Sequence, residues 1–406
     1  MTARAFDVVV VGGSVAAVRA AGTIARQAPH LSLTVVSDEA HPPHERPPLS
    51  KARLEESFDR EALTYPSAAR LREQGVVFSL NTRAEGLDVD NRRLLTTAGS
   101  LEYGALVAAT GCEPFVPPVF AGQPDVFTLR RYEDAVGLRA AVSRPGVSVA
   151  VVGAGFIGGE FAATLAKAGR QVAVIDLAKQ PLGRFGDAVA QEYQALHRAA
   201  GVQLHFGAAV TGLGEAEGRR FLLLDDGTQV PADVILVGVG VRPSTAWLEN
   251  SGVLLDNGIV CDATLKAADR VFAAGDAVRW PNPRWGASMR IEHWTNAAEQ
   301  GRVAGINAVN SLLGEAPVVC SSVPYFWSDQ HGVRIQFAGY RTGAEEIAED
   351  RNTDGLLVVY RTGDLVTGVL AFERRPQFVK LRAMLRNALP WHQAQQILSP
   401  DPAPVG

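Results

Sequence analysis

Two short turns rich in glycine and other small residues suggest binding chemistry in this 406-residue sequence. The first turn follows an apolar run, and the acidic residue Glu39 comes after it. Its candidate ligand-binding residues are Gly12, Ser14, Val15 and Ala16. Glycine lets a backbone approach a pyrophosphate, the start of a following helix stabilises the phosphate charge, and the acid accepts hydrogen bonds from ribose hydroxyls. The pattern predicts a dinucleotide site, although Ser14 and Ala17 replace the second and third glycines of G-x-G-x-x-G.

The second turn keeps all three glycines of that pattern and leads to the acid Asp176. Its residues are Gly153, Gly155, Phe156, Ile157 and Gly158. Two such turns predict two dinucleotides, one held permanently and one that exchanges. Asp176 favours NADH over NADPH, because a carboxylate accepts a hydrogen bond from the ribose 2′-OH and repels a 2′-phosphate. Lys179 and Arg184 follow closely in the sequence and could weaken that preference.

Each turn needs two strands and a helix to position it. Apolar strands are predicted over 6–11 and 147–152, ahead of the turns, and helices rich in small residues follow to about 27 and 168. Strands over 31–36 and 171–175 then lead to the acids. Strand, glycine turn, helix, strand and acid make up the βαβ unit of dinucleotide-binding domains. We therefore predict an α/β fold that contains two Rossmann-like domains.

The composition argues against several other classes of protein. The net charge of −4 and the lack of a Lys/Arg run disfavour nucleic-acid binding. No apolar stretch approaches the roughly 20 residues of a membrane span, so a soluble cytoplasmic protein is expected. The cysteines Cys112, Cys261 and Cys320 are too widely spaced for a Cys-x-x-Cys redox pair or a zinc site, and we predict no metal.

Further segments occur in a defined order along the chain. Glu45-Arg46-Pro47-Pro48-Leu49-Ser50-Lys51 follows the first acid, Ala109-Thr110-Gly111 closes a strand, and Ala274-Gly275-Asp276 closes another. Glu292-His293-Trp294 and Pro324-Tyr325-Phe326-Trp327-Ser328-Asp329-Gln330 come later. Together with the two turns, these segments resemble the oxygenase-coupled, NADH-dependent ferredoxin reductases, of the putidaredoxin reductase and biphenyl dioxygenase reductase type. The resemblance extends over essentially the whole chain.

This resemblance implies the glutathione reductase fold in three domains. An FAD-binding domain would span 1–113 and 241–320, an NAD(H)-binding domain 114–240, and a C-terminal α+β domain 321–406. Besides the first turn and Glu39, the residues implied for FAD binding are Arg46, Lys51, Ala109, Thr110, Gly111, Arg130, Asp276, His293, Trp294 and Trp327. Asp276 could instead cap a helix, Arg130 could be a surface residue, and the two tryptophans could be plain core residues.

The resemblance assigns the catalytic role to Lys51 and Glu160. Glu160 lies four residues after Phe156 on the second predicted helix, so the two side chains share one face. In the wider fold the aromatic residue covers the flavin ring, and the acid pairs with a lysine beside flavin N5, which here is Lys51. Glu160 could instead only stabilise the start of its helix.

A helix is also predicted to begin within 292–301, with Thr295 or Asn296 as its cap. Its positive end would stabilise the negative charge of a reduced flavin.

The activity implied is the transfer of electrons from NADH through FAD, one at a time, to a [2Fe–2S] ferredoxin that serves a cytochrome P450 or a Rieske oxygenase. Disulfide reductases and peroxidases of this fold use cysteines in the region of Arg46 to Lys51, and no cysteine precedes Cys112. A late cluster of basic residues could steer an acidic ferredoxin or could be a solvated surface. These residues are Arg374, Arg375, Lys380, Arg382 and Arg386.

Two alternatives stay open, because this sequence departs from the family pattern at two places. Cys112-Glu113-Pro114 follows Ala109-Thr110-Gly111 where an arginine is common, and His44 stands where a tyrosine is usual. One alternative is a reductase for rubredoxin, or for an oxygenase directly. The other is an NADH-responsive flavoprotein like apoptosis-inducing factor, which signals by changing its shape or association.

Overall fold

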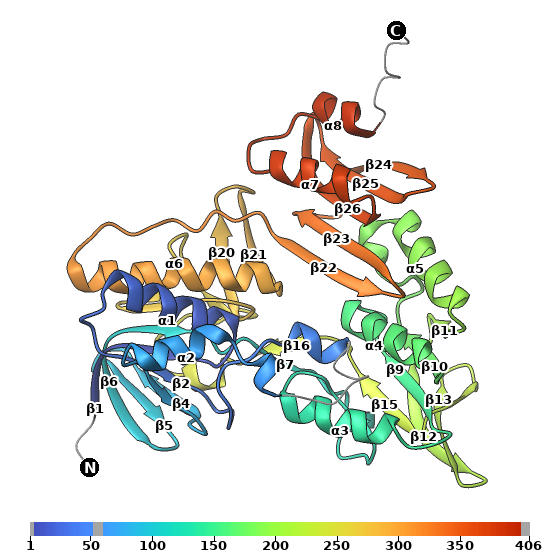
Figure 1. The fold of residues 1–406 in the computed structure, drawn as a ribbon, viewed down its shortest axis with the longest axis horizontal. Coiled ribbons are helices and arrows are strands. Elements are labelled where there is room, and N and C mark those ends of the chain that lie inside the picture. Colours follow the sequence, from blue (N-terminus) through green and yellow to red (C-terminus); the bar gives the residue numbers. More distant parts are fainter. Residues whose placement is uncertain (1–3, 52–59, 399–406) are drawn as a thin grey trace. The chain divides into compact units, whose positions relative to one another are not determined.

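The computed structural model describes residues 4–51 and 60–398, which form two compact units (Figure 1). Unit 1 comprises Met1–Arg46, Asp59–Glu113 and Val241–Pro324. Unit 2 comprises Pro47–Phe58, Pro114–Gly240 and Tyr325–Gly406. Each unit therefore combines segments that are far apart in the sequence, and each is described separately below.

An eight-stranded sheet forms the centre of unit 1. Its strand β1 (Arg4–Val11) pairs in parallel with β2 (Leu33–Val36) on one side and β6 (Gly99–Ala108) on the other. The strands β3 (Val77–Ser79) and β19 (Val271–Ala273) extend it in parallel at β2 and β6. The remaining, antiparallel strands are β4 (Ala84–Asp88), β5 (Arg93–Thr96) and β18 (Lys266–Ala268). The valines of β1 are buried, as expected for a parallel strand covered on both faces.

The helices α1 (Val15–Gln27) and α6 (Trp294–Leu313) pack against each other in unit 1. Glycines on α6 allow this close approach. A Cβ atom at Gly301 would lie 2.3 Å from the carbonyl oxygen of Ala16, and one at Gly305 would lie 2.8 Å from that of Ala20. The unit also contains α2 (Pro66–Glu73), η3 (Glu61–Leu63), η6 (Ala246–Leu248), β16 (Val241–Pro243) and a sheet of β17 (Ile259–Val260), β20 (Val278–Asn282) and β21 (Ala287–Arg290).

Unit 2 contains a second parallel sheet, with the strand order β11-β10-β9-β15-β8. Its strands are β8 (Val126–Phe127), β9 (Ser148–Val152), β10 (Gln171–Asp176), β11 (Gln203–Phe206) and β15 (Val234–Val237). Around it lie α3 (Tyr132–Val142), α4 (Phe156–Lys167), α5 (Asp187–Ala199), η1 (Pro47–Ser50), η4 (Pro118–Phe120), η5 (Gly183–Phe185) and a small sheet of β12 (Val210–Ala216), β13 (Arg219–Leu224) and β14 (Gln229–Pro231). The short strand β7 (Cys112–Pro114) lies where the chain leaves unit 1.

The last part of unit 2 is an antiparallel sheet in the order β22-β23-β26-β25-β24. It consists of β22 (Tyr325–Gln330), β23 (Val333–Gly339), β24 (Glu346–Asn352), β25 (Gly355–Thr362) and β26 (Leu365–Glu373), followed by α7 (Arg375–Met384) and α8 (Trp391–Leu398). One hydrophobic core joins this sheet to the parallel sheet, since Phe337 and Leu370 pack in the same cluster as Val151, Phe161 and Val189. The two sheets of unit 2 therefore share a core.

The predicted α/β fold with two dinucleotide-type parallel sheets is confirmed. The predicted strands and helices agree with β1, α1, β2, β9, α4 and β10 to within two residues at each end. Among the described residues, no helix combines the length and apolar character that a membrane span needs.

Candidate functional site

The first glycine turn lies directly against the predicted segment 109–111 in unit 1. Gly12 has a φ of +137°, and a Cβ atom there would lie 2.2 Å from the carbonyl oxygen of Ala109. A Cβ atom at Gly13 would lie 2.4 Å from the hydroxyl of Ser37. Gly12 therefore requires glycine, and a side chain at position 13 would need Ser37 to move. The turn follows the carboxyl end of β1, where parallel sheets bind dinucleotides.

The start of α1 suits an anion such as pyrophosphate. The helix begins at Val15, and its first turn holds no acidic residue. Ser14 makes no side-chain capping hydrogen bond within the described chain. Amide groups at a helix start carry partial positive charge. The small residues Ser14 and Ala16 thus fit the phosphate-binding role that the sequence predicts for them.

A buried charged cluster surrounds Glu39. This side chain is 7% exposed, and its Oε1 lies 2.6 Å from Nη2 of Arg46. Nδ1 of His44 lies 3.5 Å from Oε2. The structure thus brings together two of the predicted FAD-binding residues, Glu39 and Arg46. His44, one of the departures from the family pattern, contacts the same carboxylate.

The segment 274–276 meets α6 through Gln300. The side-chain oxygen of Gln300 accepts a hydrogen bond of 2.9 Å from the amide of Gly275. Gln300 is fully buried, and its Nε2 has no hydrogen-bond partner among the described residues. A buried donor of this kind needs an acceptor, and a polar cofactor could supply one. The residues of unit 1 therefore fit FAD, and Gln300 is a candidate that the sequence analysis missed.

Asp276 does not cap a helix, so that alternative is wrong. The chain continues from Asp276 into β20. The carbonyl oxygen of Asp276 accepts hydrogen bonds from Arg290 at 3.1 Å and from the thiol of Cys112 at 3.4 Å. The backbone of Asp276, whose carboxylate is predicted to bind FAD, is therefore held in place. Thr110 is held too, because its hydroxyl donates a 2.8 Å hydrogen bond to the carbonyl of Ser244.

The helix α6 begins at Trp294, with His293 at its cap position, so the predicted caps Thr295 and Asn296 are wrong. Both lie inside the first turn of the helix, which holds no acidic residue. The indole of Trp294 is partly exposed and donates a hydrogen bond of 3.2 Å to the hydroxyl of Tyr65. Burial raises the pKa of Tyr65 to about 12, so this hydroxyl stays protonated at neutral pH.

The second glycine turn, in unit 2, has a tight side and an open side. A Cβ atom at Gly153 would lie 2.3 Å from the carbonyl oxygen of Gly238, and one at Gly158 would lie 2.2 Å from that of Gly153. At Gly155, the cap residue of α4, an added Cβ would meet nothing within 4 Å. The outer glycines are required by packing, while the middle glycine faces open space at the helix start, where a pyrophosphate is predicted to bind.

Asp176, at the end of β10, holds this turn. Its Oδ2 accepts a hydrogen bond of 2.6 Å from the amide of Ala154, and its Oδ1 accepts one of 2.8 Å from the amide of Ala178. Each carboxylate oxygen can accept more than one hydrogen bond. The predicted role toward a ribose hydroxyl is therefore compatible with this structural role, which the sequence pattern did not indicate.

The structure also brings Lys51 and Glu160 together inside unit 2. Glu160 is 6% exposed, and Nζ of Lys51 lies 3.3 Å from its Oε1. Ser328 donates a hydrogen bond of 2.7 Å to Oε1, and Ser50 donates one of 2.5 Å to Oε2. Both oxygens of the carboxylate thus accept hydrogen bonds. A glutamate that only stabilised the start of its helix would not need these contacts. Neither serine was predicted, although both lie in the segments quoted for the resemblance.

Lys51 has further neighbours on β22. Its Nζ lies 3.8 Å from Oδ2 of Asp329 and 5.8 Å from the ring centre of Trp327. The ring of Trp327 stacks on that of Tyr325, with the ring centres 5.9 Å apart. Successive side chains of a strand point to opposite faces of the sheet. Trp327 and Asp329 therefore lie on one face of β22, and Ser328 lies on the other.

Other predicted residues of unit 2 lie at the start of α4 and before α3. Phe156 packs against Phe326, with ring centres 4.4 Å apart, and Ile157 is 51% exposed. Arg130 precedes α3, where its amide donates a hydrogen bond of 2.9 Å to Asp134. The roles of Phe156 and of the Arg130 side chain toward a cofactor stay predictions.

The basic cluster at the end of the chain is smaller than predicted. Arg374 is 4% exposed, and its guanidinium lies 2.6 Å from the carboxylate of Asp350, so it is not a surface charge. Lys380 and Arg382 lie on α7, and Arg386 follows the end of that helix. Arg382 is half-buried over the ring of Tyr325. The exposed cations are Arg375, Lys380 and Arg386.

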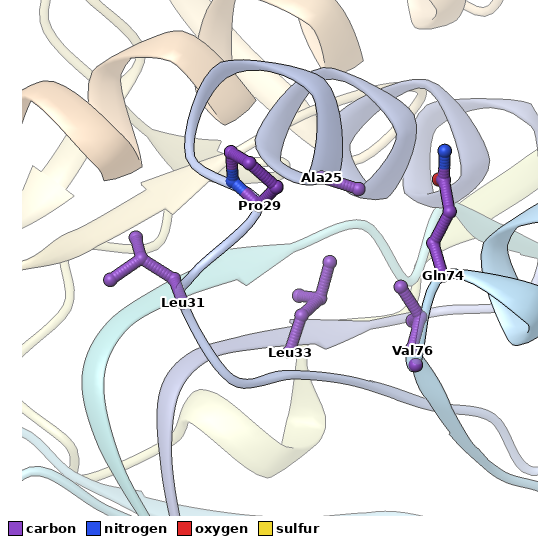
Figure 2. A pocket seen from close by; sticks show the side chains of 7 residues that line it. Ala25, Pro29, Leu31, Leu33, Gln74 and Val76 are labelled. Atoms are coloured by element: carbon purple, nitrogen blue, oxygen red, sulfur yellow. The ribbon is translucent and has the colours of Figure 1, made fainter.

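A pocket elsewhere in unit 1 is not part of this site. It lies near the end of α1 and the start of β2, lined by Ala25, Pro29, Leu31, Leu33, Gln74, Gly75 and Val76 (Figure 2). The glycine turn lies at the opposite end of the strands. Dinucleotides bind at the carboxyl ends of parallel strands, so this pocket at the amino end of β2 is not the predicted site.

Comparisons with known proteins cover nearly the whole chain. Residues 6–301 match the family described as pyridine nucleotide-disulphide oxidoreductase, and residues 325–402 match the family described as reductase C-terminal. The sequence is 30% identical to rhodocoxin reductase of Rhodococcus erythropolis, over 95% of this chain and 90% of that protein. It is 31% identical to putidaredoxin reductase of Pseudomonas putida, over 95% of this chain and 92% of that protein.

A solved structure shows the same likeness. The covalent complex of putidaredoxin reductase with putidaredoxin contains a chain that matches with a TM-score of 0.88 and 30% identity. The match covers 96% of this chain and 94% of that one.

Proposed function

The chain belongs to the pyridine nucleotide-disulphide oxidoreductase family, and from this premise we propose that it passes electrons from NADH through FAD, one at a time, to a [2Fe–2S] ferredoxin. The predicted resemblance and the glutathione reductase-like fold are confirmed, and the protein is an NADH-dependent flavoprotein oxidoreductase. The acceptor is the proposed part. In this proposal the ferredoxin serves a cytochrome P450 or a Rieske oxygenase, as the names of the similar reductases suggest.

The main observation in support of the proposal is the Lys51–Glu160 pair. Lys51 lies in the part of the sequence where disulfide reductases of this fold have their cysteines. Here that region presents an ammonium group held by a buried carboxylate. The first cysteine of the sequence is Cys112. Burial raises the pKa of Cys320 to about 12 and raises that of Cys261 as well, so neither thiol forms the nucleophilic thiolate at neutral pH. Electron transfer to an outside acceptor needs no such nucleophile.

When bound, FAD accepts two electrons with a hydride and releases them singly. We assign its binding to the first turn, Glu39, Arg46, the segments 109–111 and 274–276, Gln300, and the aromatic side chains of Trp294 and Trp327. Lys51 would place a positive charge beside flavin N5, where Glu160 fixes its position. The second turn and Asp176 would bind and orient NADH, with the aromatic ring of Phe156 at the nicotinamide position.

We keep three domains as part of the proposal, over 1–113 with 241–320, 114–240, and 321–406. The shared core of unit 2 links the second and third of these. A cytoplasmic location also belongs to the proposal, because NADH is available there.

The acceptor is proposed to bind near exposed basic residues of the C-terminal domain. Arg375, Lys380 and Arg386 are exposed, while Arg374 is not. Positive side chains on a surface attract an acidic partner and increase its association rate. This is the reason to expect a ferredoxin, since such carriers are usually acidic.

Stopped-flow spectroscopy tests the proposal. The FAD-loaded protein is mixed with NADH, and the reduced protein is then mixed with a [2Fe–2S] ferredoxin, with rubredoxin, or with buffer. Fast reoxidation by the ferredoxin alone supports the proposal. Fast reoxidation by rubredoxin alone would show a rubredoxin reductase. A long-lived charge-transfer band that no acceptor removes would show a flavoprotein that responds to NADH, like apoptosis-inducing factor.

A further inference from the structure

A continuous series of hydrogen bonds runs through unit 2 from a hairpin turn to the Glu160 carboxylate. His331 lies in the turn between β22 and β23, and its Nε2 is 3.1 Å from Nδ1 of His197 on α5. Nε2 of His197 is 2.9 Å from Oε1 of Gln330. Nε2 of Gln330 donates a hydrogen bond of 3.0 Å to Ser328, which donates to Glu160 at 2.7 Å.

The series has one consistent direction. Because Gln330 donates through its nitrogen to Ser328, its oxygen is the acceptor toward His197. His197 therefore carries its proton on Nε2 and accepts at Nδ1, and His331 donates to that atom. Every donor points toward the carboxylate of Glu160. The amide of Gln330 has separate donor and acceptor atoms, so the series orients groups and is poorly suited to pass a proton along.

Three residues of the series are almost completely buried. His197 and Ser328 are 0% exposed, and Gln330 is 1% exposed. The apolar core of unit 2, which includes Phe161 and Val189, also contains Tyr193, whose ring lies beside that of His197. In such surroundings hydrogen bonds are strong, and an unsatisfied polar group is costly. Burial lowers the pKa of His197 to about 4, so at neutral pH it keeps one donor and one acceptor.

Gly159 leaves space for this arrangement. A Cβ atom at Gly159 would lie 2.6 Å from Oε1 of Gln330 and 2.8 Å from the hydroxyl of Tyr193. The amide of Gln330 thus packs directly on the backbone of α4, one residue before Glu160. The ring of Tyr193 lies beside that of His197, with ring centres 4.4 Å apart and the planes tilted by 37°. Its hydroxyl has no hydrogen-bond partner in the described ranges, so Tyr193 takes no part in the series.

We propose that His197 is a positioning residue for the Lys51–Glu160 pair, acting through Gln330 and Ser328. It fixes the orientation of the Glu160 carboxylate and thereby the position of the Lys51 ammonium group. This inference rests on the proposed function, in which Lys51 acts beside flavin N5. A purely structural account also exists, in which the buried polar groups only satisfy one another, so the test must separate the two.

The test compares three FAD-loaded variants with the wild type. His197→Phe removes both hydrogen bonds of the ring, while His197→Gln keeps a donor toward Gln330. Tyr193→Phe is the matched control, because it removes a neighbouring polar atom outside the series. The measured quantities are the limiting rate of FAD reduction by NADH, the Kd for NADH, the FAD midpoint potential and the thermal midpoint.

His197→Phe is expected to lower the limiting rate about fivefold, which is the effect of losing one hydrogen bond between uncharged groups. The FAD potential should become more negative, because Lys51 would stabilise the reduced flavin less well. The Kd for NADH should stay within about twofold, because the NADH-binding turn is unchanged. His197→Gln should recover most of the rate, and Tyr193→Phe should match the wild type.

A folded His197→Phe protein with the wild-type rate and potential would overturn the inference, and so would a loss that His197→Gln does not repair. Gln330→Met provides a second route if His197→Phe does not fold. It should cause the same loss, and the double variant should lose no more than either single variant. Fully additive losses would also overturn the inference. If wild-type FAD is not reduced by NADH at all, the proposed function fails instead.

Nitrogen NMR of the histidines gives a readout that does not depend on turnover. At neutral pH, His197 is expected to be protonated on Nε2 and not on Nδ1, and Gln330→Met should disturb this signal. The opposite tautomer in the wild type would contradict the direction of the series.

Discussion

The ammonium group of Lys51 lies 3.3 Å from the carboxylate of Glu160, and a second contact ties the elements that carry them. The hydroxyl of Thr164, one turn after Glu160 on α4, donates a hydrogen bond of 3.3 Å to the carbonyl of Ser50. The residue before Lys51 is therefore attached to the same helix as its partner. This arrangement fixes the lysine from its backbone as well as from its charge.

Replacing the lysine tests the pair itself. Lys51→Met leaves Glu160 with two hydroxyl donors but without its cation, and we expect the limiting rate of FAD reduction to fall at least about tenfold. Loss of one partner of a fully buried pair costs about 3 to 5 kcal/mol. Lys51 is 21% exposed, so we expect a loss of unfolding free energy of about 2 kcal/mol or less. Lys167→Met, at an exposed lysine of α4, is the control. An unchanged rate in Lys51→Met would refute the role.

The two kinds of glycine in the second turn predict opposite results. Gly158→Ala forces a Cβ atom to within 2.2 Å of the Gly153 carbonyl, so the protein should lose about 1 to 3 kcal/mol of stability. Gly155→Ala places its Cβ in open space and should change stability by less than about 0.5 kcal/mol. The Kd for NADH should nevertheless rise in Gly155→Ala, because the methyl group occupies the path of the pyrophosphate. Equal stability losses in the two variants would contradict this division.

Asp176 should contribute both to cofactor preference and to the shape of the turn. Asp176→Asn removes the negative charge that repels a 2′-phosphate, so the ratio of kcat/KM for NADH to that for NADPH should fall about tenfold. The thermal midpoint should also fall, since the amide of Ala154 loses a charged acceptor. Steady-state kinetics with both cofactors and a thermal melt give the two readouts. A ratio that does not change would leave Asp176 with the structural role only.

Acid should destabilise the protein through His197. Burial lowers its pKa from 6.5 to about 4. Between these pH values, the unfolded chain binds a proton at His197 and the folded chain does not. The contribution of the neutral His197 to the free energy of unfolding is complete above pH 6.5, and it is lost as the pH falls from 6.5 to about 4. Its full size is about 3 kcal/mol. His197→Gln cannot titrate and should lose less stability over this range in denaturant titrations. Identical acid sensitivity in both proteins would argue against the assignment.

Substitutions of two arginines near α7 should have different effects, one on the stability of the protein and the other on its reaction with the partner. Arg374→Ala breaks a buried ion pair with Asp350 and should lower the thermal midpoint. Arg386→Ala removes an exposed charge and should leave the midpoint unchanged, while lowering kcat/KM for an acidic ferredoxin and weakening its dependence on ionic strength. Salt-independent ferredoxin reduction by the wild type would contradict the docking proposal.

Much of the fold was predictable because its signals are local. The valine runs of β1 and β9, the glycine turns and the acids at the strand ends all follow fixed spacing. The start of α6 was missed because His293 and Trp294 begin the helix without a polar side-chain cap. Arg374 was wrongly predicted to be exposed, since its partner Asp350 comes from β24, a pairing across the sheet that local sequence does not reveal.

The candidate site was only partly predictable for the same reason. Lys51 and Glu160 could be named from a resemblance, but Ser50, Ser328 and His197 could not. These serine and histidine residues are not part of any recognisable spacing pattern in the sequence. Their importance arises from contacts between η1, α4, α5 and β22. Such long-range contacts are visible only in three dimensions.

The order of segments in unit 1 has a consequence during synthesis on the ribosome. The edge of β6 is completed by β19, which the ribosome produces much later, after most of unit 2 has been made. Until then Leu106 and Val107 lie on an unpaired strand edge, which other chains could join. Slow translation or a shortage of chaperones should therefore favour aggregation of nascent chains that have not reached residue 271.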